Sequence, residues 1–214
     1  MEAALRITEI FYSLQGESNT VGIPTVFIRL TGCPLRCSYC DTAYAFTGGE
    51  KLAFEDILSQ VQIYNTRYVT VTGGEPLAQP ACNALMLDLL AKGYHVSLET
   101  SGALDVSGVD PRVVKVMDLK TPSSGEMHRN RLENIQYLHK SDQVKFVIAD
   151  EADYQWSKQQ LETFQLVECC QVLFSPVMGK MPAMELADRI LADQLPVRFQ
   201  IQLHKYLWND ERGK

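Results

Sequence analysis

The sequence predicts an α/β protein folded as a partial, open β/α barrel. Three observations lead to this prediction: short apolar runs recur along the chain, segments with helical spacing separate them, and polar motifs follow the runs. Alternating strands and helices favour β/α units with a parallel sheet and right-handed crossovers. The 214 residues hold too few runs for a closed eight-stranded barrel, which usually needs about 250 residues.

The apolar runs are rich in β-branched or aromatic residues, as the buried strands of parallel sheets are. The predicted strands are Thr25–Leu30, Tyr68–Thr72, Val96–Glu99, Val113–Asp118, Gln143–Ile148, Gln171–Phe174 and Val197–Gln202. The connection from the third strand to the fourth is short and rich in Gly, Pro and Ser, so we expect no full helix there.

Five stretches place apolar residues on one face of a helix. The first is the clearest, because Phe54, Ile57, Leu58, Val61 and Tyr64 recur at intervals of one, three or four residues. The others are predicted over residues 81–90, 132–138, 156–164 and 184–191. We find no repeat, low-complexity run or linker, so residues 1–214 are expected to form a single domain.

Charge and hydropathy exclude several classes of protein. The net charge of −6, from 20 basic and 26 acidic residues, argues against binding of nucleic-acid phosphates. The start of the chain lacks the pattern of a signal peptide, and no run approaches the roughly 20 apolar residues that span a bilayer. We therefore expect a cytoplasmic protein with neither a nucleic-acid nor a membrane partner. In that compartment its six cysteines would serve metals or chemistry more often than disulfides.

Polar motifs follow most of the predicted strands. They lie at residues 31–33, 73–76, 100–102, 119–121, 175–176 and 204–205. Because parallel β/α proteins place their active sites at the carboxyl ends of the strands, we expect these motifs to converge at one edge of the sheet.

A cluster of three cysteines carries the most chemical information. Cys33, Cys37 and Cys40 have the spacing C-x3-C-x2-C, so one loop could present three thiolates to zinc or to an iron–sulfur cluster. Structural zinc needs four protein ligands, and no fourth cysteine or histidine lies beside the loop. A [4Fe–4S] cluster held by three thiolates would leave one iron open to a ligand. A non-catalytic zinc or iron–sulfur protein remains an alternative at this point.

The cysteine spacing, with Tyr39 before the third cysteine, resembles the signature of radical S-adenosylmethionine enzymes. Gly73–Gly74–Glu75–Pro76 is similar to the Gly-Gly-Glu-Pro motif of that superfamily. The resemblance implies a [4Fe–4S] cluster on the three cysteines, with S-adenosylmethionine bound at the open iron. The residues expected near this cofactor are Tyr39, Cys40, Asp41, Gly73, Gly74, Glu75, Pro76, Gly102, Lys120 and Ser175.

A narrower resemblance covers nearly the whole chain. The segments Ser13–Glu17, Phe27–Leu30, Cys40–Thr42, Glu99–Gly102 and His204–Leu207 together resemble the 7-carboxy-7-deazaguanine synthase family. That resemblance implies a lyase of queuosine and deazapurine biosynthesis. It would convert 6-carboxy-5,6,7,8-tetrahydropterin into 7-carboxy-7-deazaguanine and release ammonia, with no catalytic residue beyond the cluster and S-adenosylmethionine. It also implies a homodimer and an electron donor such as flavodoxin.

The same resemblance assigns substrate and magnesium contacts. Leu14, Gln15 and Gly16 would line the pterin pocket, Arg29 and Thr100 would contact the substrate, and Thr42 would coordinate Mg²⁺. A guanidinium fork matches a carboxylate with two parallel hydrogen bonds, which suits Arg29 to this substrate. Without the resemblance, Gln15–Gly16 would be an ordinary turn, Arg29 a structural salt bridge and Thr42 a helix cap.

Some segments depart from the family pattern. Many relatives have Ser-Pro-Lys where this chain has Asp118–Leu119–Lys120, and only Lys120 matches. Cys82 lies on an apolar helical face and is expected in the core, and the Cys169–Cys170 pair is expected to be buried. An activase of glycyl-radical enzymes shares the cysteine spacing and is the alternative within the superfamily. It would have no use for a pterin site at Gln15, Arg29 and Thr42.

Overall fold

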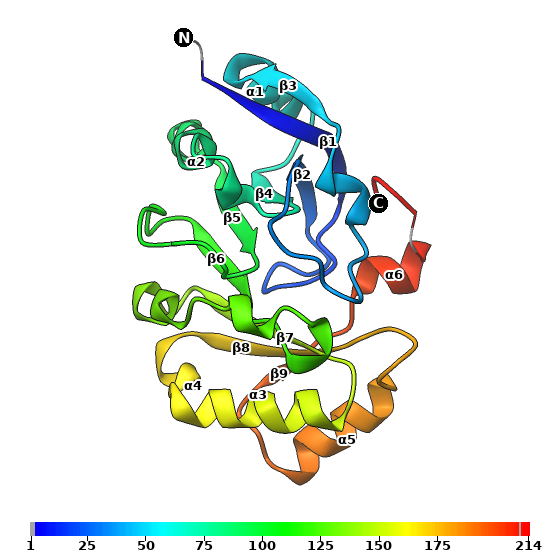
Figure 1. The fold of residues 1–214 in the computed structure, drawn as a ribbon. Coiled ribbons are helices and arrows are strands. Elements are labelled where there is room, and N and C mark those ends of the chain that lie inside the picture. The colour runs from blue at the N-terminus through cyan, green and yellow to red at the C-terminus, as the bar shows by residue number, and fades with distance from the viewer. Residues whose placement is uncertain (1–2, 210) are drawn as a thin grey trace.

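One open sheet organises the computed structural model, which describes residues 3–209 and 211–214. Across these residues the strand order is β3-β1-β2-β4-β5-β6-β7-β8-β9 (Figure 1). The strands are β1 (Ala4–Leu14), β2 (Pro24–Leu30), β3 (Glu50–Ala53), β4 (Tyr68–Gly73), β5 (His95–Thr100), β6 (Val114–Asp118), β7 (Gln143–Ile148), β8 (Gln171–Pro176) and β9 (Arg198–Phe199). From β2 to β9 neighbouring strands are parallel, and the edge strands β3 and β9 do not pair. The partial barrel is confirmed.

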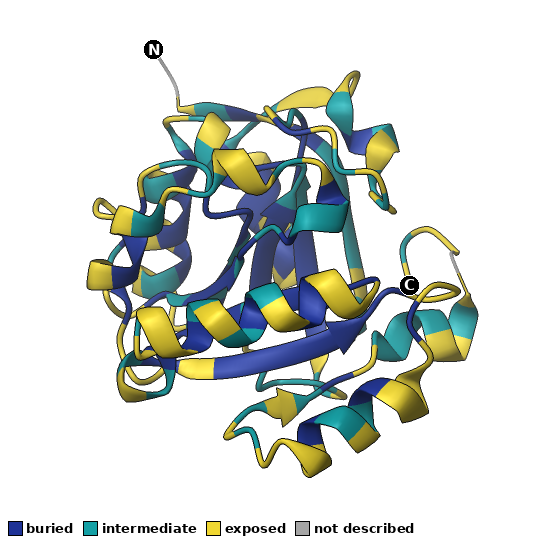
Figure 2. Ribbon diagram, turned by 60° about the horizontal axis from the view of Figure 1, so that its bottom comes forward, coloured by how far each residue is buried: buried dark blue, intermediate teal, exposed yellow. Residues whose placement is uncertain are grey.

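Helices cover the outer side of the sheet (Figure 2). They are α1 (Phe54–Gln62), α2 (Cys82–Ala91), α3 (Glu151–Thr163), α4 (Leu166–Cys169) and α5 (Ala183–Ala192). The sixth helix, α6 (Leu203–Trp208), lies apart from them on the side of β1 and β2 (Figure 1). Four of the five predicted helices are confirmed, and α4 and α6 were not predicted. In the described part of the chain, no helix has the length and apolar character needed to cross a membrane.

The helix predicted over residues 132–138 is wrong, because Leu132–Tyr137 forms a 3-10 helix. The buried side chain of Asn134 explains the difference. Its amide donates to the carbonyl oxygens of Gly102 and Leu104 and accepts from the main-chain N–H of Val106. These contacts tie the segment to the loop after β5 and hold it in short turns rather than in a continuous α-helix.

The two sides of the strands differ in chemistry. In β4, Val69 and Val71 pack under the helices, whereas Thr70 and Thr72 are buried on the inner side. The apolar side forms two clusters, one beneath α1 and α2 and one beneath α3, α4 and α5. Because side chains alternate along a strand, the inner side keeps the polar groups. The core therefore lies between sheet and helices, and the concave side is free for chemistry.

Strands β1 and β3 were not predicted, and strand β9 is shorter than the predicted strand Val197–Gln202. β1 pairs antiparallel with both β2 and β3, and β9 spans only two residues. In β1, Ile7 lies opposite Leu30 and Glu9 lies opposite Arg29, so Thr8 is an extra residue that forms a β-bulge. The bulge breaks the two-residue alternation by which a half-buried strand is found in a sequence.

Candidate active site

A cavity of about 260 Å³ lies at the carboxyl ends of the parallel strands. The structure brings together there most of the residues predicted from the sequence. Those that line the cavity are Leu14, Gln15, Gly16, Arg29, Cys33, Cys37, Tyr39, Cys40, Asp41, Thr42, Gly73, Gly74, Thr100 and Lys120. Glu75, Pro76, Gly102 and Ser175 lie outside its lining. Segments far apart in the sequence close it, since α6 and the residues after it return to the side of β1 and β2 (Figure 1).

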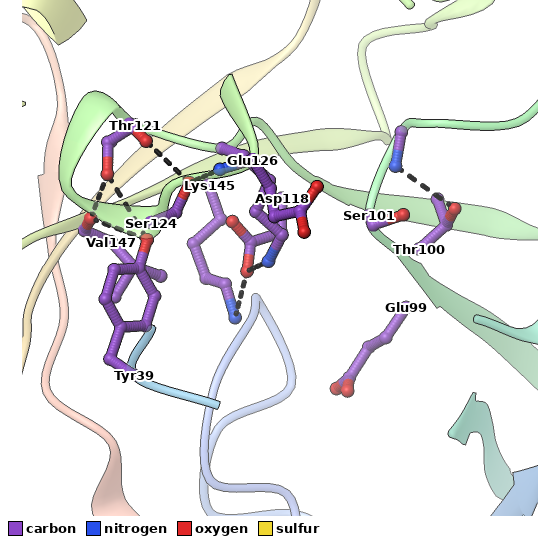
Figure 3. Close-up of polar contacts among 12 residues, drawn as sticks. Tyr39, Glu99, Thr100, Ser101, Asp118, Thr121, Ser124, Glu126, Lys145 and Val147 are labelled. Atoms are coloured by element: carbon purple, nitrogen blue, oxygen red, sulfur yellow. Dashed lines mark hydrogen bonds and ion pairs between the residues drawn. The ribbon is translucent and has the colours of Figure 1, made fainter. Parts of the chain in front are cut away.

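The loop that carries the three cysteines is anchored to the ends of β6 and β7. Figure 3 shows the hydroxyl of Tyr39 beside the Thr121 hydroxyl, 3.2 Å away, and the Val147 carbonyl, 3.5 Å away. Burial raises the pKa of Tyr39 to about 12, so the phenol keeps its proton and remains a donor at neutral pH. The main chain of Ser38 donates to the Ser124 carbonyl at 2.9 Å. These contacts tie the loop to the segments after β6 and to β7.

Two glycines at the end of β4 let the backbone approach this loop. A Cβ at Gly74 would lie 2.4 Å from the carbonyl oxygen of Gly32 and 2.7 Å from the Cβ of Cys33. Gly73 has φ +153°, and a Cβ there would lie 2.3 Å from the Leu30 oxygen. Neither position has room for a side chain. The Gly-Gly pair thus brings bare backbone to the cavity wall next to the first cysteine.

Glu75 is fully buried behind that wall, and its carboxylate is already occupied. It accepts from the Thr100 hydroxyl at 2.9 Å and from the main-chain N–H groups of Ser101 and Leu77 at 2.7 and 3.1 Å. The Ser101 hydroxyl donates to it as well. Glu75 therefore fixes the loop after β5 relative to the loop after β4, and its place near the cofactor, which the motif implies, stays a prediction.

The three thiols that would hold an iron–sulfur cluster line one cavity. Cys33, Cys37 and Cys40 line the same cavity and form no disulfide. Among the described residues, no group of three His, Cys, Asp or Glu side chains converges where one metal ion could be held. A zinc ion needs its ligands about 2.3 Å from a single point, whereas each thiolate of a cluster binds a different iron. Of the other cysteines, Cys82 and Cys170 are buried, as predicted, and Cys169 is half-buried.

A group of four charged side chains lies on the wall beside the cysteines. The Lys145 ammonium is 2.5 Å from Glu17 and 3.7 Å from Asp118, and Lys120 is 2.9 Å from the same Asp118 oxygen. Burial lowers the pKa values of both lysines, but the carboxylates outweigh it and the net pKa shift is upward. Both lysines therefore stay charged. The second Asp118 oxygen is buried with no hydrogen-bond partner in the described residues, so it can accept from a bound ligand.

The floor of the cavity is polar and rigid. The Gln15 amide donates to the Thr70 hydroxyl at 3.1 Å and to Glu99 at 3.3 Å, and its oxygen accepts from the Glu17 main chain. This side chain is thus engaged within the protein. Gly16 has no room for a side chain, because a Cβ would lie 2.1 Å from Nδ1 of His204.

Thr42 lies in the lining of the cavity, and its side chain has one hydrogen-bond partner among the described residues. This residue precedes the short 3-10 helix Ala43–Phe46, but its hydroxyl makes no capping hydrogen bond. The hydroxyl donates instead to Asp41 at 2.8 Å, and Asp41 also pairs with Lys205 at 2.7 Å. A hydroxyl and a carboxylate side by side in the cavity are the oxygen donors that Mg²⁺ prefers.

Sequence reasoning did not identify several residues of the site. Besides Lys145 and Glu17, these include Tyr44, Glu99, Asp118, Asn209 and residues 211–214, which line the cavity. Glu9 lies outside the lining and pairs with Arg29. Lys145 and Asp118 could have been found, because a charge inside a predicted buried strand needs a partner. Glu9 carried no such signal, since the strand that holds it was not predicted.

Comparisons with known proteins agree with this geometry. The sequence profile of the radical SAM superfamily matches residues 27–119, which include the cysteine loop and the Gly-Gly-Glu-Pro motif. A crystal structure of Streptococcus suis SuiB bound to precursor peptide SuiA has a TM-score of 0.61 at 14% identity, covering 80% of this chain and 46% of that one. Fold and site thus define a protein of the radical S-adenosylmethionine class.

The similarity to curated proteins is more specific. A 7-carboxy-7-deazaguanine synthase of Chlorobaculum tepidum is 44% identical over 99% of this chain and 98% of its own length. One from Koribacter versatilis is 41% identical over 97% of this chain and 98% of its length. The crystal structure of QueE from Escherichia coli has the same fold, with a TM-score of 0.74 at 23% identity over 94% of this chain and 95% of that one. This chain belongs to the 7-carboxy-7-deazaguanine synthase family.

Proposed function

We propose that the chain is a 7-carboxy-7-deazaguanine synthase. It is a lyase that converts 6-carboxy-5,6,7,8-tetrahydropterin into 7-carboxy-7-deazaguanine. Loss of one ammonia accounts for the whole difference between substrate and product, so the net reaction consumes no oxidant or reductant. The observation that carries this proposal is the 44% identity along almost the full length of a curated synthase. The cavity supports it, because the three cysteines and Arg29 line one space.

The cofactor contacts follow from the lining of the cavity. Cys33, Cys37 and Cys40 would hold a [4Fe–4S] cluster, which together with S-adenosylmethionine supplies the one-electron chemistry of the reaction. Candidate contacts to S-adenosylmethionine in the lining are Tyr39, Cys40, Asp41, Gly73, Gly74 and Lys120. The buried Asp118 oxygen adds an acceptor for a hydroxyl or ammonium donor. The family resemblance also implies contacts to S-adenosylmethionine from Glu75, Pro76, Gly102 and Ser175, which lie outside the lining of the cavity.

The substrate contacts use the other side of the cavity. Leu14, Gln15 and Gly16 would form the pterin floor, with Gln15 acting chiefly by holding Glu17 and Glu99 in place. The Thr100 hydroxyl donates a hydrogen bond to Glu75 and accepts one from the main-chain N–H of Gly102, so one lone pair remains for the substrate. Arg29 would bind the substrate carboxylate. Thr42 would add one oxygen ligand to an Mg²⁺ ion that is also coordinated by water and by the substrate carboxylate.

The protein also needs partners, and the family favours particular ones. We infer a one-electron donor such as a flavodoxin, a homodimer, and action in the cytoplasm. We further infer that residues 1–214 act as one domain, since a single sheet joins the two apolar clusters.

The decisive experiment is direct. The protein is reconstituted anaerobically with iron and sulfide, reduced, and incubated with S-adenosylmethionine, Mg²⁺ and the tetrahydropterin. We expect a product lighter than the substrate by one ammonia, with the mass and ultraviolet spectrum of the deazapurine. Cleavage of S-adenosylmethionine without any deazapurine would mean a different radical enzyme. Stoichiometric zinc in a protein with iron-free activity would reject the cluster as well.

A further inference from the structure

Arg29 and Glu9 are direct neighbours across two antiparallel strands. Their Cα atoms are paired in the β1–β2 register, next to the pair formed by Phe11 and Phe27. The bulge at Thr8 produces this arrangement. Without the extra residue, Glu9 would share a strand face with Ile7, which is buried in the apolar core. The bulge therefore turns Glu9 from the helix side of the sheet to the cavity side.

The guanidinium of Arg29 is held on three sides. Its Nε donates to Oε1 of Glu9 at 2.7 Å. Its carbon lies 5.6 Å from the ring centroid of Phe11 and 5.9 Å from that of Tyr44. The Tyr44 hydroxyl donates to the same Glu9 oxygen, also at 2.7 Å. One carboxylate oxygen thus fixes both the arginine and one of the rings that pack against it.

The remaining side of the guanidinium is available. Within residues 3–209 and 211–214, neither terminal nitrogen of Arg29 has a hydrogen-bond partner, although the side chain is only 16% exposed. Arg29 lines the cavity, as do Phe11 and Tyr44. A carboxylate can pair with the two terminal nitrogens in parallel, and the Nε side is closed to it by Glu9.

We propose that Glu9 is a positioning residue that, together with Tyr44, aims the terminal nitrogens of Arg29 at the carboxylate of the substrate. This inference rests on the proposed function and deepens it, since it explains how the site selects a pterin that carries a carboxylate. Glu9 contributes by restricting the rotation of a long side chain before the substrate arrives.

A second guanidinium supports Tyr44 from outside. The carbon of Arg212 lies 3.9 Å from the centroid of the Tyr44 ring. Tyr44 is therefore packed between the segment after α6 and Arg29, and its hydroxyl is directed to Glu9. Because Arg212 packs against the Tyr44 ring, Tyr44 can hold the acceptor oxygen of Glu9 toward Arg29.

The test compares two stable probes, 6-carboxypterin and 6-hydroxymethylpterin. They differ only at position 6, where the first carries the carboxylate that Arg29 would bind and the second carries a hydroxymethyl group. Equilibrium dialysis measures their binding to holoenzyme loaded with cluster, S-adenosylmethionine and Mg²⁺. We expect the parent to prefer the carboxylate. Glu9→Ala should reduce that preference about tenfold by weakening only 6-carboxypterin, as expected when an ion pair loses its orientation rather than its charge. Glu9→Gln keeps an acceptor oxygen and should retain most of the preference.

Three controls make the result specific. Glu185→Ala removes a carboxylate that pairs with Arg189 on the outer helix α5, and it should change neither probe. Arg29→Ala should lower the preference further than Glu9→Ala does, to the part that Mg²⁺ alone supplies, and adding Glu9→Ala to it should have no further effect. Iron content and circular dichroism confirm that each variant is folded.

Two outcomes would overturn the proposal while leaving the proposed function intact. Glu9→Ala could keep the parental preference, or it could weaken both probes equally, as a purely structural residue would. If the parent itself binds both probes equally, the substrate role of Arg29 fails together with that of Glu9.

Discussion

Replacing Glu75 with glutamine should destabilise the fold strongly, although the two side chains have nearly the same shape. The Glu75 carboxylate is fully buried and accepts hydrogen bonds at both oxygens. One oxygen faces the main-chain N–H of Leu77, and the other faces that of Ser101. A glutamine amide has only one acceptor oxygen, so in either orientation its NH₂ group meets a main-chain N–H.

The magnitude follows from these contacts. The hydroxyls of Thr100 and Ser101 can turn to suit an amide, but a main-chain N–H cannot. The variant therefore loses one hydrogen bond to a charged acceptor, about 1.5–3 kcal/mol, and leaves one buried donor unpaired, about 1–3 kcal/mol. Because such losses overlap, we expect about 2–4 kcal/mol in the free energy of unfolding. In a chain of 214 residues this corresponds to a fall of about 4–16 °C in Tm.

The assay is urea and thermal unfolding of the metal-free protein, followed by circular dichroism. Glu185→Gln is the matched control, since it makes the same chemical change at an exposed pair with Arg189 and should cost about 0–1 kcal/mol. If Glu75→Gln lowers the free energy of unfolding no more than Glu185→Gln does, the Glu75 carboxylate does not hold the loops after β4 and β5 together. Its carboxylate would then be free to serve the cofactor directly.

Further predictions concern the metals and pH. Replacing any of the three clustered cysteines by alanine should remove most of the bound iron, whereas replacing Cys82 in the core should leave the iron content unchanged. Thr42→Ala should raise the apparent KM and weaken the response of initial rates to Mg²⁺, while Thr42→Ser keeps the response. An identical Mg²⁺ curve in Thr42→Ala would remove this residue from the site. Burial raises the pKa of Glu17, but the Lys145 ammonium outweighs it and the net pKa lies below the usual 4.5. A lowered folded-state pKa stabilises the protein above that value, and the contribution is lost as pH falls. Glu17→Gln should therefore be less stable at pH 7 and should lose less stability than the parent between about pH 5 and 3, as urea unfolding at each pH would show. Parallel pH profiles would contradict this.

The sequence by itself determined the parts of the protein that depend on short-range patterns. The alternation of apolar runs and amphipathic segments predicted β4 with α2 and β7 with α3. When one side of an element is buried, apolar residues recur along the sequence at a regular spacing, and nearby residues suffice to show it. The spacing of Cys33, Cys37 and Cys40 placed three thiols on one loop. The topology of parallel strands then predicted that this loop and Gly73–Gly74 would meet at one cavity.

Only the tertiary structure decided how the polar groups pair. Glu9 faces Arg29 because of a bulge, and a bulge exists only relative to the partner strand. Glu17 and Lys145 are 128 positions apart in the sequence, yet their charges meet at 2.5 Å. Glu75 matched a cofactor motif, and the structure adds its hydrogen bonds to the loops after β4 and β5. A side chain's partners depend on strand register and on which loops converge, and neither property is contained in local spacing.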